Sequence, residues 1–153
     1  MKILLAMDGS KYSESALQTL LTHYKPDETE VLVLHAVESL KLMPVSSGFG
    51  MGPVLVQDYV ALSERWRKEG EDLVLQTSQR LQAAGFKVAT RVEEGDAKQV
   101  ILDSAGNWRP DLILLGNQGK TGLDRLLLGS VSEAVARGAP CSVQIVRAPD
   151  LAA

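Results

Sequence analysis

The 153-residue sequence predicts an α/β fold built around a parallel sheet, and two observations lead to this prediction. Five short apolar runs alternate with helical patterns, or with a glycine loop followed by one, which is typical of parallel strands joined by right-handed crossovers. The first, second and fourth runs are nearly continuous in Leu, Ile, Val and Ala, as expected of strands buried on both faces. The five runs are 3–7, 31–37, 86–92, 112–115 and 142–146.

The third run differs from the others because polar residues alternate with apolar ones. Lys87 and Arg91 interrupt the apolar pattern. Alternation of this kind indicates a strand with one wetter face. We therefore expect this run to lie at an edge of the sheet.

The first two helices are placed by caps and apolar periodicity. The first is predicted to begin near Ser10, a plausible N-cap, and to end before Pro26. The second is predicted from about Gln57 to Ala84, with Gly85 as the residue that ends it. Its apolar stripe, which we expect to be buried, consists of Tyr59, Leu62, Trp66, Leu73, Thr77, Leu81 and Ala84.

Two further helices begin with the pattern of a capping box, in which a capping residue is followed three positions later by Glu or Gln. Asp96 and Gln99 form this pattern at the third helix. Ser130 and Glu133 form it at the fourth, which is predicted to run to Arg137. The hydroxyl of Ser130 is therefore expected to cap the last helix.

Residues 42–56 fit neither a helix nor a strand. Alternating glycines disfavour both, while Phe49 and Met51 are too apolar for an ordinary solvated loop. Two interpretations stay open, a surface loop and a lid that folds over a ligand.

Composition restricts the class of protein. With 45% apolar residues and a single cysteine, residues 1–153 are expected to form one domain without disulfides. A net charge of −3 argues against nonspecific binding to nucleic acid, which needs a basic face. No segment has the roughly 18 apolar residues of a membrane span, and the apolar start stops at Asp8, too early for a signal peptide. We therefore expect a cytoplasmic protein that binds neither membranes nor nucleic acid.

A glycine-rich segment after the fourth strand carries the main functional signal. Its glycines are Gly116, Gly119, Gly122 and Gly129. Glycines here let the backbone turn tightly and let a ligand approach main-chain N–H groups. The amides of Ser130, Val131 and Ser132, at the positive end of the last helix, would complete an anion site, and phosphate is the obvious anion. The alternative left open is a long connection that needs glycines only in order to turn.

Two nucleotide motifs are disfavoured by their spacing. The Gly119-Lys120-Thr121 sequence is similar to the end of a Walker A loop, but the required earlier glycine falls at Leu114, inside a strand. The turn after the first strand lacks the G-x-G-x-x-G of a dinucleotide site. P-loop NTPases and dinucleotide dehydrogenases therefore fit poorly.

Asp8 ends the first strand, as Gly116 follows the fourth. In an open parallel sheet of order 3-2-1-4-5 these strands are neighbours, the winding reverses between them, and ligands bind at their carboxyl ends. A carboxylate on one side of this crevice and an anion site on the other suit a nucleotide, because the carboxylate can accept hydrogen bonds from ribose or base. The alternative for Asp8 is a turn residue that bonds its own backbone.

With these features, the chain resembles the universal stress protein family over essentially its whole length. The matching segments are 3–10, 31–37, 94–96 and 111–116. The most specific match is the pattern G-x2-G-x9-G-[ST], filled by Gly116, Gly119, Gly129 and Ser130. Chance matches to so long a spacing are rare.

The resemblance implies an open five-stranded parallel sheet of order 3-2-1-4-5, with helices on both faces in a Rossmann-like arrangement. It also implies ATP as the ligand, with Mg²⁺ or Mn²⁺ held by the phosphates. By matching position Asp8 would face adenosine, and the backbone of Val37 would bond adenine. The ribose and phosphates would be held by Gly116, Gly119, Gly129, Ser130 and Val131.

One departure from the family concerns the glycine segment. Asn117 and Gln118 stand where many relatives carry small or basic residues. Lys120 would supply the missing positive charge, or else it is an ordinary solvated lysine.

The family also tends to dimerise through its last strand. Residues 142–147 contain neither Pro nor Lys, so an edge strand here would favour antiparallel pairing with a second copy. The predicted function is an ATP-binding stress-response regulator that acts as a dimeric, nucleotide-dependent switch. The alternatives are an ATP-hydrolysing or nucleotidyl- or phosphoryl-transfer enzyme, and an interaction module that binds no nucleotide.

The enzyme alternative lacks a positioned catalytic group. His35 lies within an apolar strand, where a hydrogen-bonded core histidine is the more common case. No second carboxylate is evident near Asp8 in the sequence. We therefore assign no catalytic residue and no protein metal ligand, and expect at most slow ATP hydrolysis.

Overall fold

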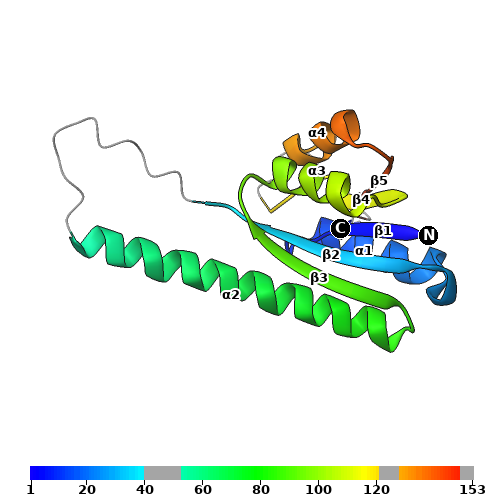
Figure 1. Cartoon of the computed structure of the whole chain (residues 1–153), viewed down its shortest axis with the longest axis horizontal. Coiled ribbons are helices and arrows are strands. Elements are labelled where there is room, and N and C mark those ends of the chain that lie inside the picture. Colours follow the sequence, from blue (N-terminus) through cyan, green and yellow to red (C-terminus); the bar gives the residue numbers. More distant parts are fainter. Residues whose placement is uncertain (40–52, 121–127, 149–153) are drawn as a thin grey trace, which may run out of the picture.

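The computed structural model describes residues 1–39, 53–120 and 128–148, with the backbone alone for residues 53–56. Within these residues five parallel strands form one open sheet in the order β3-β2-β1-β4-β5 (Figure 1). The strands are β1 (Lys2–Ala6), β2 (Glu30–Val37), β3 (Lys87–Glu94), β4 (Leu112–Gly116) and β5 (Ser142–Val146). The predicted fold class and strand order are confirmed.

Helices cover both faces of this sheet (Figure 1). On one face lie α1 (Lys11–His23) and α2 (Pro53–Ala83), and on the other lie α3 (Ala97–Trp108) and α4 (Ser130–Gly138). A short 3-10 helix, η1 (Pro26–Glu28), precedes β2. Among the described residues no helix combines the length and the apolar character needed to cross a bilayer.

The central strand β1 shows why the apolar runs are nearly continuous. Ile3 and Leu5 pack into the cluster under α1 and α2, whereas Leu4 packs into the cluster under α3 and α4, and all three are fully buried. A strand with helices on both sides needs apolar residues at every position. At the edge, β3 has no fully buried residue and packs Val88 and Val92 against the first cluster, as its alternating sequence predicted.

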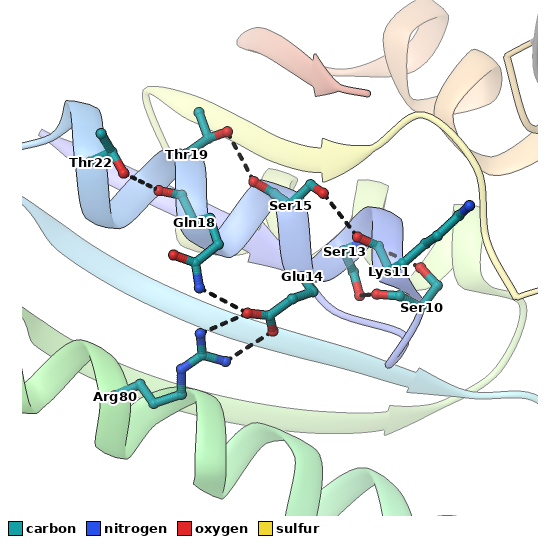
Figure 2. Close-up of polar contacts among 9 residues, drawn as sticks. All are labelled: Ser10, Lys11, Ser13, Glu14, Ser15, Gln18, Thr19, Thr22 and Arg80. Carbon is teal, nitrogen blue, oxygen red and sulfur yellow. Dashed lines mark hydrogen bonds and ion pairs between the residues drawn. The ribbon is translucent and has the colours of Figure 1, made fainter. Parts of the chain in front are cut away.

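Polar contacts position the first turn of α1 (Figure 2). The Ser10 side chain accepts a hydrogen bond from the Ser13 amide at 3.2 Å, so the predicted N-cap is confirmed. Arg80 of α2 donates two hydrogen bonds to the Glu14 carboxylate, at 2.9 and 2.6 Å (Figure 2). These bonds hold the pKa of Glu14 below its usual value, and they tie α1 to α2.

The helix α2 departs from the prediction at its start. It begins at Pro53 rather than near Gln57, because proline is tolerated in a first helical turn, where its missing N–H would have no helical partner. Residues 53–56 therefore belong to a helix and not to an irregular segment. The question of a lid over the ligand falls on residues 40–52, which lie outside the described residues.

The predicted buried stripe of α2 is correct only in its middle. Thr77 and Leu81 are buried and Trp66 is half-buried, but Leu62 is 37% exposed and Ala84 is exposed as well. The helix is longer than the sheet that it covers (Figure 1). The apolar face of α2 therefore continues beyond the end of the sheet, where none of the described strands covers it.

Candidate functional site

A cavity of about 690 Å³ lies at the carboxyl ends of β1, β2 and β4. Its volume falls within the range of small-molecule pockets, roughly 300–1,000 Å³. Its position is the reversal point of the sheet, since β1 pairs with β2 on one side and with β4 on the other. Helices α2 and α4 supply the remaining sides.

The structure brings every predicted site residue to this cavity. The nine residues are Asp8, Val37, Gly116, Gly119, Lys120, Gly129, Ser130, Val131 and Ser132. They come from four separate parts of the chain, and only the sheet topology makes them neighbours. The crevice expected between the first and fourth strands is therefore present.

Asp8 lies in the turn between β1 and α1. Its Oδ1 accepts a hydrogen bond from the Ser10 amide at 2.9 Å, and Gly9 between them has a φ of +77°, which favours glycine. The alternative assignment, a turn residue that bonds its own backbone, is thus correct for Oδ1. The second oxygen, Oδ2, lies on the side of Gly119: a Cβ atom on that glycine would be 3.0 Å from it.

The glycines after β4 are required for different reasons. A Cβ atom on Gly116 would lie 2.6 Å from the carbonyl carbon of Tyr12, so this glycine lets β4 approach the α1 backbone. A Cβ atom on Gly129 would lie 3.2 Å from both Asn117 O and Gln118 Cα. Gly116 and Gly129 therefore allow close packing within the protein, whereas Gly119 leaves room beside a carboxylate that lines the cavity.

The N-terminus of α4 corrects one prediction. The N-cap is Gly129, and Ser130 is the first helical residue, so the expected Ser130–Glu133 capping box is wrong. The Glu133 amide donates to the Gly129 carbonyl at 2.9 Å, which is the first hydrogen bond of the helix. The preceding three amides, of residues 130–132, have no partner within the helix and lie at the cavity.

The hydroxyl of Ser132 is used inside the protein. Its single proton is shared between the carbonyl oxygens of Asn117 and Gly129, at 2.9 Å each, and the Gly129 amide donates to the same Asn117 oxygen at 2.7 Å. These bonds fasten the start of α4 to the end of β4. Ser132 can therefore offer a ligand its main-chain N–H, while its side chain fixes the helix in place.

Charged groups of both signs line the cavity. Lys120 extends across the β1–α1 turn, where its Nζ would be 3.6 Å from a Cβ atom on Gly9. Besides Asp8, the acidic residues Glu38 and Glu69 line the cavity, and Glu69 forms an ion pair with Arg65 at 3.2 Å. Both are distant from Asp8 in sequence, so sequence reasoning did not connect them with this site.

Sequence reasoning also missed the side of the cavity formed by β2 and α2. His35 lines the cavity, and its Nδ1–H donates to the Met7 carbonyl at 2.7 Å, so it is hydrogen-bonded as predicted. Trp66 and Gly70 of α2 complete this side. A glycine in the interior of a 31-residue helix is the signal that could have revealed a close approach there.

These observations define the class of protein as an open, Rossmann-like α/β domain with a ligand cavity at its reversal point. The chain belongs to the Universal stress protein family, whose sequence profile matches residues 1–147. It is 32% identical over 148 residues to universal stress protein MJ0531 of Methanocaldococcus jannaschii, a match that covers 97% of this chain and 82% of that protein.

Solved structures show the same fold. The hypothetical protein MJ0577 superposes with a TM-score of 0.80 at 26% identity, over 95% of this chain and 94% of that one. A universal stress protein in complex with cAMP gives 0.67 at 21% identity, over 97% of both chains. The Arabidopsis thaliana family protein At3g01520, with AMP bound, gives 0.68 at 19% identity, over 98% and 93%.

Proposed function

We propose that this chain is a stress-response regulator that binds ATP in the cavity at the β1–β4 crevice. The observation that carries the proposal is the start of α4, where three amides without helical partners line the cavity and a glycine stands at the N-cap. Such amides and the positive end of the helix dipole favour phosphate. Solved proteins of the same fold that carry AMP or cAMP support an adenine nucleotide as the ligand.

In this proposal, different cavity residues bind the ribose, the adenine and the phosphates. Asp8 keeps Oδ2 for ribose hydroxyls, since Oδ1 is used by the Ser10 amide. The Val37 backbone would bond the adenine, as in the family. The phosphates would lie against Gly116, Gly119, Gly129, Ser130, Val131 and Ser132, with the Lys120 ammonium beside them.

The donor set fits a divalent cation carried by the phosphates. Within the described ranges no group of three or more His, Cys, Asp or Glu side chains is arranged to hold a metal ion. The single positive charge of Lys120 would not balance the negative charge of a triphosphate next to Asp8. Mg²⁺ commonly binds through phosphates, waters and one or two carboxylates, so a cation such as Mg²⁺ or Mn²⁺ would neutralise the phosphates and reduce their repulsion from Asp8.

Regulation is a better proposal than catalysis for this site. His35, the histidine that lines the cavity, uses Nδ1–H to hold the Met7 carbonyl, which makes it a structural group. We propose that nucleotide occupancy changes what the protein binds, with any hydrolysis far slower than the roughly 1 per second of ordinary enzymes. Single-turnover release of phosphate from ATP tests this, and a rate near that value would favour the enzyme. The expected cytoplasmic location stays a prediction.

Calorimetric titration with Mg-ATP tests the binding site itself. Asp8→Asn keeps an oxygen that can accept from the Ser10 amide but removes the charge, so we expect affinity to fall roughly tenfold, as for a lost charge-assisted hydrogen bond. Asp27→Asn is the matched control, because it removes the same charge in η1, at the amino ends of the strands. Equal affinities of the two variants would contradict the assignment of Asp8.

A homodimer through residues 142–147 is part of the same proposal. The Val146 carbonyl of β5 accepts from Asn117 on the β4 side, so the alternating residue Ile145 directs its N–H outward. Ile145→Pro removes that donor, and Ile145→Ala controls for lost packing. Light scattering should show a dimer for the wild type and Ile145→Ala and a monomer for Ile145→Pro; dimers of all three would exclude this interface.

A further inference from the structure

One face of α2 forms a side of the cavity. Trp66, Gly70 and Leu73 line it at spacings of four and three residues, which places them on the same helical face. We call these three residues the α2 wall. Val37 and Glu38 line the same cavity, so the α2 wall stands beside the end of β2.

Gly70 sets how closely the α2 wall approaches β2. A Cβ atom on Gly70 would overlap His35 Cδ2 and would lie 3.0 Å from His35 Nε2 and 3.4 Å from Val37 Cγ2. No larger residue fits this place without displacing the imidazole. The α2 backbone at Gly70 is therefore packed directly against the side chains of His35 and Val37 near the end of β2.

Trp66 lies one helical turn before Gly70, about 6 Å away along the helix axis. The helix α2 runs antiparallel to β2 and extends past its carboxyl end (Figure 1). Trp66 is half-buried and lines the cavity. A large aromatic residue and the end of β2, at Val37 and Glu38, therefore border the same cavity.

We propose that Trp66 stacks on the nucleobase and forms the aromatic half of the base subsite. The inference rests on the proposed function, and it assigns the two sides of a purine to different parts of the chain. The Val37 backbone would form hydrogen bonds with the edge of the purine, and the Trp66 indole would stack on the flat face of the purine. Stacking of a base on an aromatic side chain strengthens binding and tolerates any base, because every base has a flat face.

Two ion pairs support the helix around Trp66. Arg65 pairs with Glu69 at 3.2 Å and Arg67 pairs with Glu71 at 3.4 Å, both at the i,i+4 spacing that supports a helix. The Arg67–Glu71 pair spans the interior glycine, which by itself weakens a helix. A ring carried by a stiff helix loses little freedom when a ligand binds, so more of the stacking energy appears as affinity.

The test compares ligands that share phosphates but differ in the base. Mg-ATP and inorganic tripolyphosphate with Mg²⁺ are titrated into the wild type, Trp66→Leu and Trp66→Phe. Trp66→Leu should bind ATP roughly tenfold more weakly, because leucine keeps an apolar side chain but offers no flat ring. Trp66→Phe should retain most of the affinity, and tripolyphosphate should bind all three proteins equally.

A second measurement uses the other tryptophan as an internal control. Trp108 ends α3 at the opposite end of the sheet, where Lys2 Nζ lies 4.3 Å from the centre of its ring. In Trp108→Phe the remaining fluorescence comes from Trp66, and ATP should quench it while tripolyphosphate leaves it unchanged. In Trp66→Phe, the remaining emission from Trp108 should not respond to ATP.

The outcomes separate this inference from the proposed function. If the wild type binds ATP but Trp66→Leu binds it within twofold of the same affinity, stacking by Trp66 is excluded and the ATP site stands. If Trp66→Leu weakens ATP and tripolyphosphate equally, the effect is on the whole cavity and the inference is again overturned. If the wild type binds no adenine nucleotide, both proposals fall together.

Discussion

The first turns of α1 and α4 both line the same cavity, but they differ in whether side chains accept hydrogen bonds from their amides. At α1 the Ser10 side chain accepts from the Ser13 amide, and Asp8 accepts from the Ser10 amide. At α4 the N-cap is Gly129, and the described residues place no side-chain cap on the helix. Side chains thus accept from two amides at the start of α1, whereas no described side chain caps the start of α4.

The start of α3 has a side-chain cap, as the start of α1 does. Asp96 Oδ1 accepts from the amides of Lys98 and Gln99 at 3.0 and 3.4 Å, as its sequence pattern predicted. The Gln99 side chain bonds Asp103 instead of returning to Asp96, so only half of the box forms. The missing side-chain cap at α4 is therefore a difference between these helix starts, and it is the feature on which the proposed phosphate site depends.

The strongest test converts α4 into a capped helix. In Gly129→Asp the new carboxylate can accept from the helix amides and repel phosphate, so we expect affinity for Mg-ATP to fall about 100-fold, the equivalent of roughly 3 kcal/mol. Calorimetry measures the change. The control is Gly129→Ala, which adds the same Cβ atom near Asn117 O and Gln118 Cα without a charge. An equal loss in both variants would attribute the effect to the crowded Cβ position.

The next test removes the cap that α1 possesses. Ser10→Ala should lower the free energy of unfolding by about 1 kcal/mol, because the Ser13 amide loses its acceptor. For a chain of this size the melting temperature should fall by about 2–4 °C. Ser15→Ala is the control, since that hydroxyl donates to the Lys11 carbonyl inside the helix and caps nothing. If the two variants melt together, the Ser10 cap contributes no stability.

A smaller effect concerns the bond that holds α1 to α2. The pKa of Glu14 is lowered from 4.5 chiefly by its hydrogen bonds from Arg80, so the folded state favours the ionised carboxylate. Its contribution is therefore complete above pH 4.5 and is lost as the pH falls through the lower folded value. Both side chains are 44% exposed, and solvent screening keeps the contribution below about 1 kcal/mol.

Chemical denaturation of Glu14→Gln across pH checks this contribution. The wild type should be more stable than the variant at pH 7, and the difference should vanish well below pH 4.5. Glu71→Gln, which breaks the exposed Arg67 pair within α2, is the control and should change stability by less than about 0.5 kcal/mol. A difference for Glu14→Gln that is constant with pH would show that ionisation of Glu14 is irrelevant to it.

The smallest expected change comes from Ser130→Ala. Because Ser130 is exposed and follows the cap rather than forming it, the free energy of unfolding should change by less than about 0.5 kcal/mol. Thermal melts beside Ser10→Ala give the direct comparison. If Ser130→Ala lowers the free energy of unfolding as much as Ser10→Ala does, Ser130 caps α4 after all.

Most of the fold was predictable because periodicity reports directly on burial. The continuous run of β1 reflects helices on both faces, and the alternation in β3 reflects an edge. Strand order was available only through the resemblance to the family, because no local pattern encodes which strands are neighbours. The predicted burial of Leu62 in the α2 stripe is wrong for the same reason. The apolar period of a helix does not indicate where the sheet beneath it ends.

The candidate site was predictable where its residues carry local signals. Glycines and the end of an apolar run marked Gly116, Gly119 and Asp8. The cap at α4 was misassigned because Gly129 and Ser130 are both acceptable N-caps, and the choice depends on backbone angles that the sequence does not display. Trp66 was expected in the core, since an aromatic residue on an apolar stripe looks the same whether it packs on a sheet or lines a cavity.

The paired bonds at Asn117 O have a consequence for how the cavity can diversify. This oxygen receives both the Gly129 amide and the Ser132 hydroxyl, so the two ends of the intervening chain are fastened by atoms outside it. The place of α4 beside the sheet is therefore fixed by contacts that do not involve residues 121–127. Insertions or grafted recognition peptides between Lys120 and Leu128 should leave the sheet and α4 intact.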